Sequence, residues 1–453
     1  MPRMTLSGTI RTTALLCLVV PGLLLNARNG LASDADYEHE AIGYGTATPD
    51  NALSQLKQRI EAGDADLQYD KEFGWLPSLL EELNVDPASQ MLVYSKTSLQ
   101  RNRIAPRTPR ALYFNDVVYV GYCHNGEVIE ITAVDPQLGA VFYTIYQDEI
   151  ETPKLLRQTD NCIICHASSS HTGGIPGHVV RSVFTDAGGL PVLAAGSFRI
   201  DQQSPLEERW GGWYVTGTHG KAEHLGNLIV RDKSKPETIL PENLNVTDIT
   251  DRLNTSNYLV PHSDIVALMV MEHQTATHNK LTQAHFAAKR ALWDERILDE
   301  AFGDDSDECR ESTIRRINNS AEPLVEYLLF SEEAKLDGAI KGTSGFAENF
   351  AKLGPHDGKG RSLREFDLKT RMFKYPLSYL IYSEAFDALP DMTKQRVYLR
   401  LHEILTGEDT SEKFAHLSQA DRQAIYEILL ETKEGLPGYW SDPAAKGAAQ
   451  ASR

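Results

Sequence analysis

The sequence predicts an α+β fold, in which an antiparallel β-rich domain is followed by a mostly helical domain. Three patterns predict it. Between Met91 and Tyr146, β-branched and aromatic residues alternate with polar ones, and the groups FND, CHNGE and DPQLG fit turns between the segments. From His262 to Phe302 the apolar spacing is helical, with Ser263 as a natural cap and Gly303 as the end. Residues 311–330 and the stretch to about Tyr439 continue in a helical pattern.

The first 33 residues have the features of a signal peptide. Arg3 and Arg11 precede a short apolar run, ALLCLVVPGLLL, and small residues follow near Ala32 and Ser33. An uncleaved membrane anchor is the alternative, but the run is shorter than the roughly 20 residues that span a bilayer. We therefore expect cleavage, export to the periplasm, and no stable membrane insertion of the mature protein.

The remaining chain divides by pattern into five regions. Helical segments LSQLKQRIEAG, ending at Gly63, and WLPSLLEELNV form a lead-in to a meander of five strands: LVYSK, ALYF, VVYVGY, VIEITAV and AVFYTIY. Further on, DAGG marks a hairpin, GGWYVTG is a short strand, and a glycine-rich loop precedes three helices with candidate caps at Thr410 and Ser418. We expect a lead-in over 34–90, a β-rich domain over 91–260, a long-helix region over 261–335, a C-terminal helical domain over 336–440 and a disordered tail over 441–453.

The charge of the chain excludes some partners. Of its residues, 41% are apolar and 24% are charged, and the formal net charge is −18. Residues 1–33 hold three arginines and no acidic residue, so cleavage moves the charge to −21. Such an acidic protein is not expected to bind nucleic acid or anionic lipid. The acidity would suit a basic redox partner, or it simply keeps the protein soluble.

The segment TDNCIICHASSSHTGG, residues 159–174, carries the strongest chemical signal. Cys162, Cys165 and His166 form a Cys-x-x-Cys-His motif, which is the attachment signal for c-type haem. Two sulfurs three residues apart lie on one side of a helical turn and can form thioethers with the two vinyl groups of a porphyrin. The next residue then places its imidazole under the ring as the proximal iron ligand. The sequence therefore predicts one covalent haem c.

Other interpretations of this motif are weaker. A thioredoxin-like pair needs a strand-to-helix context, whereas LLRQTDN before the motif is typical of a loop. A zinc site needs two further ligands, from Cys123, Cys309 or a histidine, and a structural disulfide is the simplest alternative. A second haem is not expected, because Val120 stands where Cys123-His124 would need a cysteine. Whether Cys123 and Cys309 pair stays open at this stage.

The motif and several longer runs carry a resemblance. The runs FNDVVYVGY, DPQLGAVFYT, RWGGWYVTGTHG and REFDLKTRMFKYPLSYLIYSEAFDALP are similar to a group of large, exported, single-haem bacterial cytochromes. The resemblance extends over most of the mature chain. It implies haem and export, but no particular activity, because none is established for that group.

The function depends on which group, if any, binds the iron on its distal side, opposite His166. No methionine lies between His166 and Met269, so the short-range methionine loop of small carriers is absent. His219, His224 and His273 are the histidine candidates for a distal ligand or pocket group. His178 is a further option, and Met269 and Met271 are more often core residues. A core role bonded to a carbonyl is the alternative for His273.

Arginines after the motif suit the haem propionates. Arg181 and Arg209 are the candidates, and a surface position is the alternative for each. Trp210 and Trp213 lie beside them and would stack at a ring edge or fill the core.

Three functions follow from these predictions. The first is an exported electron-transfer cytochrome that serves a periplasmic redox partner protein. The second is a haem enzyme, peroxidase-like or a small-molecule oxidoreductase, which the large size of the chain around one haem favours. The third is a haem-based sensor or binding module.

Overall fold

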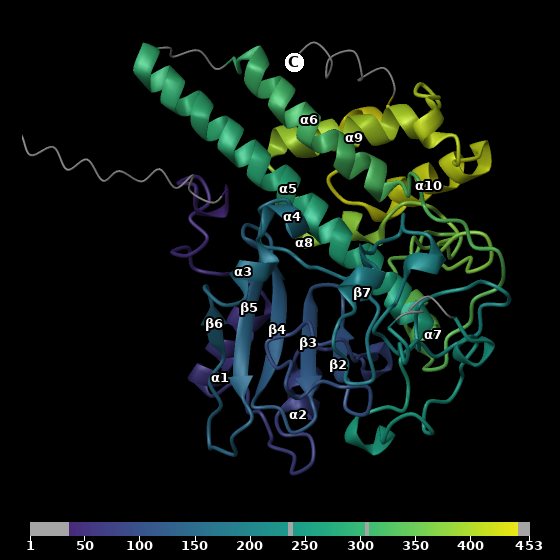
Figure 1. Ribbon diagram of the computed structural model, residues 1–453. Helices are drawn as coiled ribbons and strands as arrows, with labels where there is room; N and C mark the ends of the chain where they lie inside the picture. Colours follow the sequence, from purple (N-terminus) through teal and green to yellow (C-terminus); the bar gives the residue numbers. More distant parts are fainter. Residues whose placement is uncertain (1–35, 234–238, 304–307, 443–453) are drawn as a thin grey trace, which may run out of the picture. The chain divides into compact units, whose positions relative to one another are not determined.

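A six-stranded antiparallel sheet dominates the N-terminal half of the computed structural model, which describes residues 36–233, 239–303 and 308–442 (Figure 1). Its strands pair in sequence order and are β1 (Met91–Val93), β2 (Arg110–Phe114), β3 (Val118–Cys123), β4 (Val128–Asp135), β5 (Gly139–Tyr146) and β6 (Leu156–Gln158). The predicted α+β fold and the meander are confirmed. The strand β6 lies where the sequence predicts a loop, because three residues without apolar alternation give no strand signal.

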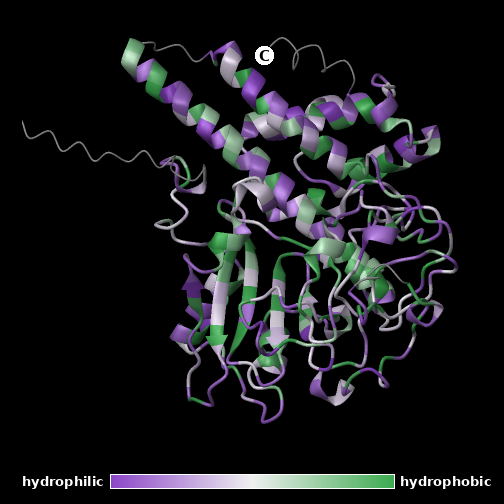
Figure 2. Cartoon of the chain, viewed as in Figure 1, coloured by the Kyte–Doolittle hydropathy of each residue, from purple (hydrophilic) through white to green (hydrophobic). Residues whose placement is uncertain are grey.

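The two faces of the sheet differ in polarity. One face is apolar and buried, and it packs against α1 (Ala52–Ala62) and α2 (Leu76–Glu82) in one hydrophobic cluster. On the other face, the register aligns Leu112, Gly121, Glu130 and Thr144 across β2 to β5. Successive side chains of a strand point to opposite faces of the sheet. These four residues therefore point away from the apolar face and can line a cavity. Figure 2 shows the hydrophobic residues concentrated in the strands.

The long helix α5 (Ile265–Phe302) begins one residue later than the predicted cap implies. Asp264 is the N-cap, and its side chain accepts hydrogen bonds from the amides of Val266 and Ala267. Ser263 instead accepts a bond from the amide of Leu92 and donates one to the carbonyl of Tyr214. At the other end Gly303 takes a left-handed φ of 64°, as the sequence predicts.

The helices after α5 share one core with it. They are α6 (Glu311–Leu328), α7 (Phe346–Ala351), α8 (Glu384–Asp387), α9 (Asp391–Leu405) and α10 (Gln419–Thr432). In the described residues after 360, α8, α9 and α10 are the three helices that the sequence predicts, whereas α7 lies within the glycine-rich segment that is predicted as a loop. Ser418 caps α10 through a capping box with Asp421, as predicted, whereas Thr410 caps no helix: the turn Glu412–Phe414 has Ser411 as its N-cap.

The segments between the motif and α5 are less regular than predicted. A short hairpin, β7 (Arg181–Val183) with β8 (Ser197–Arg199), flanks the DAGG turn. GGWYVTG forms no strand and pairs only through isolated bridges, Val93 with Trp213 and Thr216 with Asp264. Both bridges hold this segment between the sheet and the start of α5.

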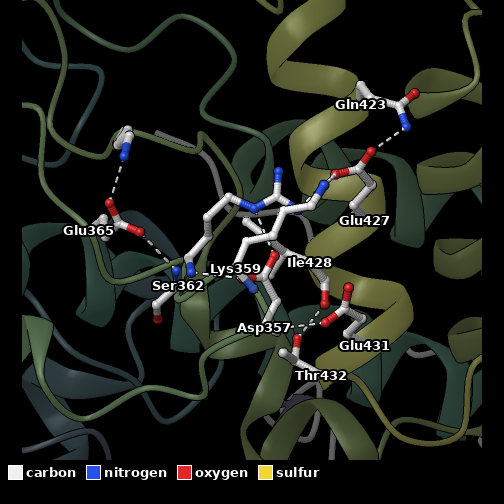
Figure 3. A network of polar contacts seen from close by, with 12 residues as sticks. Asp357, Lys359, Ser362, Glu365, Gln423, Glu427, Ile428, Glu431 and Thr432 are labelled. Carbon is white, nitrogen blue, oxygen red and sulfur yellow. Dashed lines mark hydrogen bonds and ion pairs between the residues drawn. The ribbon is translucent and has the colours of Figure 1, made fainter.

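The glycine-rich loop before α8 is fastened to α10 by charged contacts (Figure 3). Glu427 of α10 bonds Lys359 Nζ at 2.7 Å and Arg361 Nη2 at 2.8 Å. Glu431 accepts a bond from the amide of Gly358 at 2.6 Å. These contacts tie the loop to α10.

The expected domain boundaries after residues 90, 260 and 335 fall inside one compact unit of the described chain. The largest hydrophobic cluster joins Met91 of β1 to Trp440 near the end of the described chain. The predicted signal peptide over 1–33 and most of the predicted tail over 441–453 lie outside the described residues. Among the helices of the described ranges, none combines the length and the apolar character that crossing a membrane requires.

Candidate functional site

The Cys-x-x-Cys-His motif forms a single helical turn, α3 (Ile163–His166). The amide of His166 donates to the carbonyl of Cys162 at 3.0 Å, and the amide of Ala167 donates to that of Ile163 at 2.9 Å. Ile163 is buried in the core beneath the sheet, whereas Ile164 is 74% exposed. The buried isoleucine fixes the turn, and both cysteines are then presented from one short segment.

The motif lines a cavity of about 430 Å³ between the polar face of the sheet, the turn and α5. Cys162, Cys165 and His166 all contribute to its wall. The sheet contributes Leu112, Gly121, Glu130, Thr132, Phe142 and Thr144, and the opposite side contributes Val180, Trp213, Met271 and Thr275. The volume falls within the range of about 300–1,000 Å³ that is usual for cofactor sites. A larger hollow of about 750 Å³, lined by Arg107, Tyr214 and Arg252 among others, contains none of the predicted site residues.

His166 is held in one orientation by the loop that follows it. Its Nδ1 lies 3.0 Å from the carbonyl oxygen of Gly177, and the amide of Gly177 donates to the carbonyl of His166 at 2.8 Å. A carbonyl only accepts hydrogen bonds, so Nδ1 is the donor and Nε2 carries the free lone pair. Burial lowers the pKa of His166 and keeps the ring neutral. This is the tautomer and second-shell bond typical of a metal-binding imidazole.

The two thiols of the motif form no disulfide in the structure. Cys162 and Cys165 are free, and burial raises the pKa of Cys162 to about 11. A thioredoxin-like pair would need a thiol with a lowered pKa, so the environment of Cys162 disfavours that interpretation. Cys123 and Cys309 are also free in the structure and do not pair with each other.

A zinc site finds no support in the part of the chain that the structure describes. There, no group of three or more His, Cys, Asp or Glu side chains is placed to hold a metal ion. Haem iron needs only axial ligands from the protein, because the porphyrin supplies the other donors.

The histidines predicted for the distal side lie elsewhere. His273 is buried in the helical core, where Nε2 lies 2.8 Å from Ser378 Oγ and Nδ1 bonds Gln202. His224 accepts a bond from the amide of Gly226 at Nδ1, and its Nε2 lies 3.1 Å from Nε2 of His219. None of the three lines the cavity.

The predicted propionate arginines are also outside the cavity lining. Arg209 is buried and pairs with Glu272 at 2.9 Å, while it donates to the carbonyls of Gln202 and Ser204. Arg181 donates to Ser197 Oγ on the neighbouring strand β8. Trp213 does line the cavity, whereas Trp210 is a core residue bonded to Glu272.

The structure adds three residues to the cavity that sequence reasoning missed. Arg110 of β2 and Glu130 of β4 form an ion pair on the polar face, and Ser98 Oγ donates to the Glu130 carboxylate at 3.0 and 3.1 Å. One signal was available, since Arg110 begins β2 and Glu130 is a charged residue within β4. Their pairing across Gly121 depends on the register of three strands, which the sequence does not reveal.

His178 also lines the cavity, immediately after Gly177. Its ring packs 4.4 Å from that of Tyr119, and both ring nitrogens are buried without a hydrogen-bond partner. Burial lowers its pKa well below the usual range.

Comparison with protein-family models, with curated proteins and with solved structures finds no match. The chemistry of the site is therefore argued from its own residues. Two free thiols and an imidazole whose Nε2 carries the lone pair line one cavity, and these groups fit a covalently attached haem.

Proposed function

We propose that this chain is an exported monohaem c-type cytochrome that acts in redox chemistry in the periplasm. Cys162 and Cys165 would hold the haem through thioether bonds, and His166 would bind the iron from the proximal side. A haem held in this way supplies one-electron oxidation and reduction.

One observation carries this proposal: His166 shares the cavity wall with both thiols, and its Nδ1 is bound to the Gly177 carbonyl. That bond leaves Nε2 as the only ring nitrogen able to bind iron. The helical turn keeps both sulfurs on the same short segment.

The proposal is tested by replacing both cysteines with alanine. The wild-type protein, produced with a c-type maturation system, is expected to keep its haem through denaturation and acidic organic extraction. Cys162→Ala/Cys165→Ala should lose all haem under the same treatment. Cys123→Ala/Cys309→Ala is the matched control and should keep it. Haem that survives extraction in the first double variant would contradict covalent attachment at this motif.

An enzymatic role is the second candidate, and the charged pair in the cavity favours it. A carrier keeps its haem among apolar groups and needs no acid–base residue, whereas Arg110 and Glu130 both face the space beside the motif. Carbon monoxide distinguishes the two functions. Rapid binding to the reduced protein would support an open iron site, and an inert, six-coordinate spectrum would support electron transfer alone.

A further inference from the structure

We propose that residues 96–107, the basic rim, form a docking surface for an acidic one-electron carrier protein at the mouth of the motif cavity. The inference rests on the proposed function, since it requires a redox-active haem at the Cys-x-x-Cys-His motif. It deepens that function by assigning the chemistry of the partner. The total charge of the chain alone would suit a basic partner instead.

The basic rim differs in charge from the rest of the chain. The whole sequence has 63 acidic and 45 basic residues, whereas the rim has no acidic residue and four basic ones: Lys96, Arg101, Arg103 and Arg107. At about 0.1 M salt, charges are screened over about 10 Å. A protein that touches the rim therefore senses these four side chains more strongly than the net charge of −18.

Acidic side chains near the rim are paired with basic ones: Glu127 with Arg103, Glu130 with Arg110, and Asp186 with Lys233. Asp160, two residues before the motif, is an exposed acidic residue. On the rim itself, Lys96, Arg101 and Arg107 form neither an ion pair nor a side-chain hydrogen bond with any residue that the structure describes. Their charges are therefore available to a partner.

The basic rim borders the same cavity as the motif. Its residues in the cavity wall are Lys96, Thr97, Ser98, Leu99 and Arg101, and the motif adds Cys162 and Cys165. Gln100 fastens the rim to the start of β4, since its side chain donates to the carbonyl of Val128 and accepts from the amide of Glu127, both at 2.9 Å. A carrier on the rim would therefore lie beside the proposed haem, as electron transfer between two proteins requires.

Exposed apolar side chains accompany these charges. Leu99 of the rim is 60% exposed, and Ile164, between the two cysteines, is 74% exposed. Leu190 is 55% exposed, and its neighbour Gly189 accepts a hydrogen bond from the amide of Lys96 at 3.0 Å. Protein interfaces combine apolar contacts with surrounding polar groups, and complementary charges steer the encounter. The apolar side chains would supply the contacts and the basic ones the steering.

Stopped-flow measurements of electron transfer from reduced flavodoxin, an acidic carrier, to the oxidised haem-loaded protein test this surface. Both proteins are acidic, so net charge predicts a rate that rises with salt. Docking at the rim predicts a rate that falls between about 0.05 and 0.5 M salt. Lys96→Glu/Arg101→Glu should lower the rate about 10-fold at the lower salt concentration.

The matched control is Lys352→Glu/Lys369→Glu, which changes the net charge equally at two exposed positions outside the cavity wall. Its rate should stay within about 3-fold of wild type. A second measurement does not depend on electron transfer. Carbodiimide joins carboxylates to lysine amines, so cross-linking to flavodoxin followed by peptide mass spectrometry should place the main cross-link at Lys96.

Several outcomes would overturn the inference. These are a rate that rises with salt, equal rates in the two double variants, or cross-links distributed evenly over the exposed lysines. A haem spectrum that changes in Lys96→Glu/Arg101→Glu would show that these side chains bind the haem instead of a partner. A dimer that the same variant dissociates would assign the surface to a second copy of this chain. In each case the haem remains attached, so the proposed function survives, whereas its own failure would appear as a protein without covalent haem.

Discussion

At the scale of single residues, the loop from His166 to His178 is the most informative part of the chain. The motif itself could be predicted from the sequence, because its spacing and its chemistry are local. The partners of the other histidines could not be predicted. His273, for example, forms hydrogen bonds with Gln202 and Ser378, which are 71 and 105 residues away in the sequence. Arg209 was predicted to pair with a haem propionate, but in the structure it pairs with Glu272 in the core. The sequence does not reveal this partner, because the two residues are distant along the chain.

Gly177 provides a residue-scale prediction. An added Cβ there would collide with the side chain of Asn279, which itself holds the backbone of His178 through bonds of 2.8 and 2.7 Å. Gly177→Ala should therefore displace the loop that anchors His166 and lower the free energy of unfolding by about 1–3 kcal/mol. Chemical denaturation of the haem-loaded protein measures this loss. Gly438→Ala, where an added Cβ meets nothing within 4 Å, is the control, and equal losses in both variants would contradict the account.

At the scale of elements, the helix α5 shows what pattern reasoning can and cannot find. Its extent and its Gly303 end were predicted from spacing and composition. Its N-cap was misplaced by one residue, because serine and aspartate are both good caps and the choice depends on tertiary partners. Ser263 is used by Leu92 and Tyr214, which come from distant segments.

Asp264 joins the start of α5 to the loop at residues 343–344, and this gives the element-scale prediction. One carboxylate oxygen caps the helix, and the other accepts bonds from the amides of Thr343 and Ser344 at 2.6 and 2.9 Å and from Ser344 Oγ. Asp264→Asn would turn an amide group toward those donors and should cost about 2–4 kcal/mol of stability.

Urea denaturation measures the stability loss of Asp264→Asn, and the variant Asp248→Asn is the control. Asp248 makes a similar local turn with Thr250. Within the described ranges, no hydrogen bond or ion pair joins Asp248 to a distant segment, and the control should change stability by less than about 1 kcal/mol. A loss in Asp264→Asn no larger than in the control would show that the junction contributes little.

At the scale of the whole molecule, one hydrophobic core is continuous from β1 to the C-terminal helices. The division of the chain into separate domains stays a prediction from the sequence. Sequence pattern detects which elements have apolar faces and not which faces meet. The first turns of α5 are buried on every side, so this helix belongs to the sheet and to the helical part alike.

Buried neutral histidines give the whole-molecule prediction. Burial lowers the pKa of His224 and of His273 to about 3, and that of His278 and of His285 to about 4. The unfolded chain therefore binds more protons than the folded chain below the ordinary histidine pKa of about 6.5, so stability falls as pH decreases through 6.5 toward 4. Burial raises the pKa of Glu272 and of Glu333 to about 7, which acts in the opposite direction between about 4.5 and 7.

Four histidines outweigh two carboxyl groups, so the net effect is a loss of stability in acid. Between pH 6.5 and 5 we expect the free energy of unfolding to fall by about 1–3 kcal/mol per pH unit. Denaturation midpoints measured at several pH values in one buffer system test this slope. A midpoint that is constant or rises toward pH 5 would show that these histidines are protonated in the folded protein.

The central claim is that one haem is bonded to Cys162 and Cys165, and intact-protein mass spectrometry tests it most directly. The protein exported with a working maturation system should carry the added mass of one haem under denaturing conditions, and fragmentation should locate that mass on the peptide around residues 159–174. A polypeptide of unmodified mass, or one with a Cys162–Cys165 disulfide in place of the haem, would contradict the account.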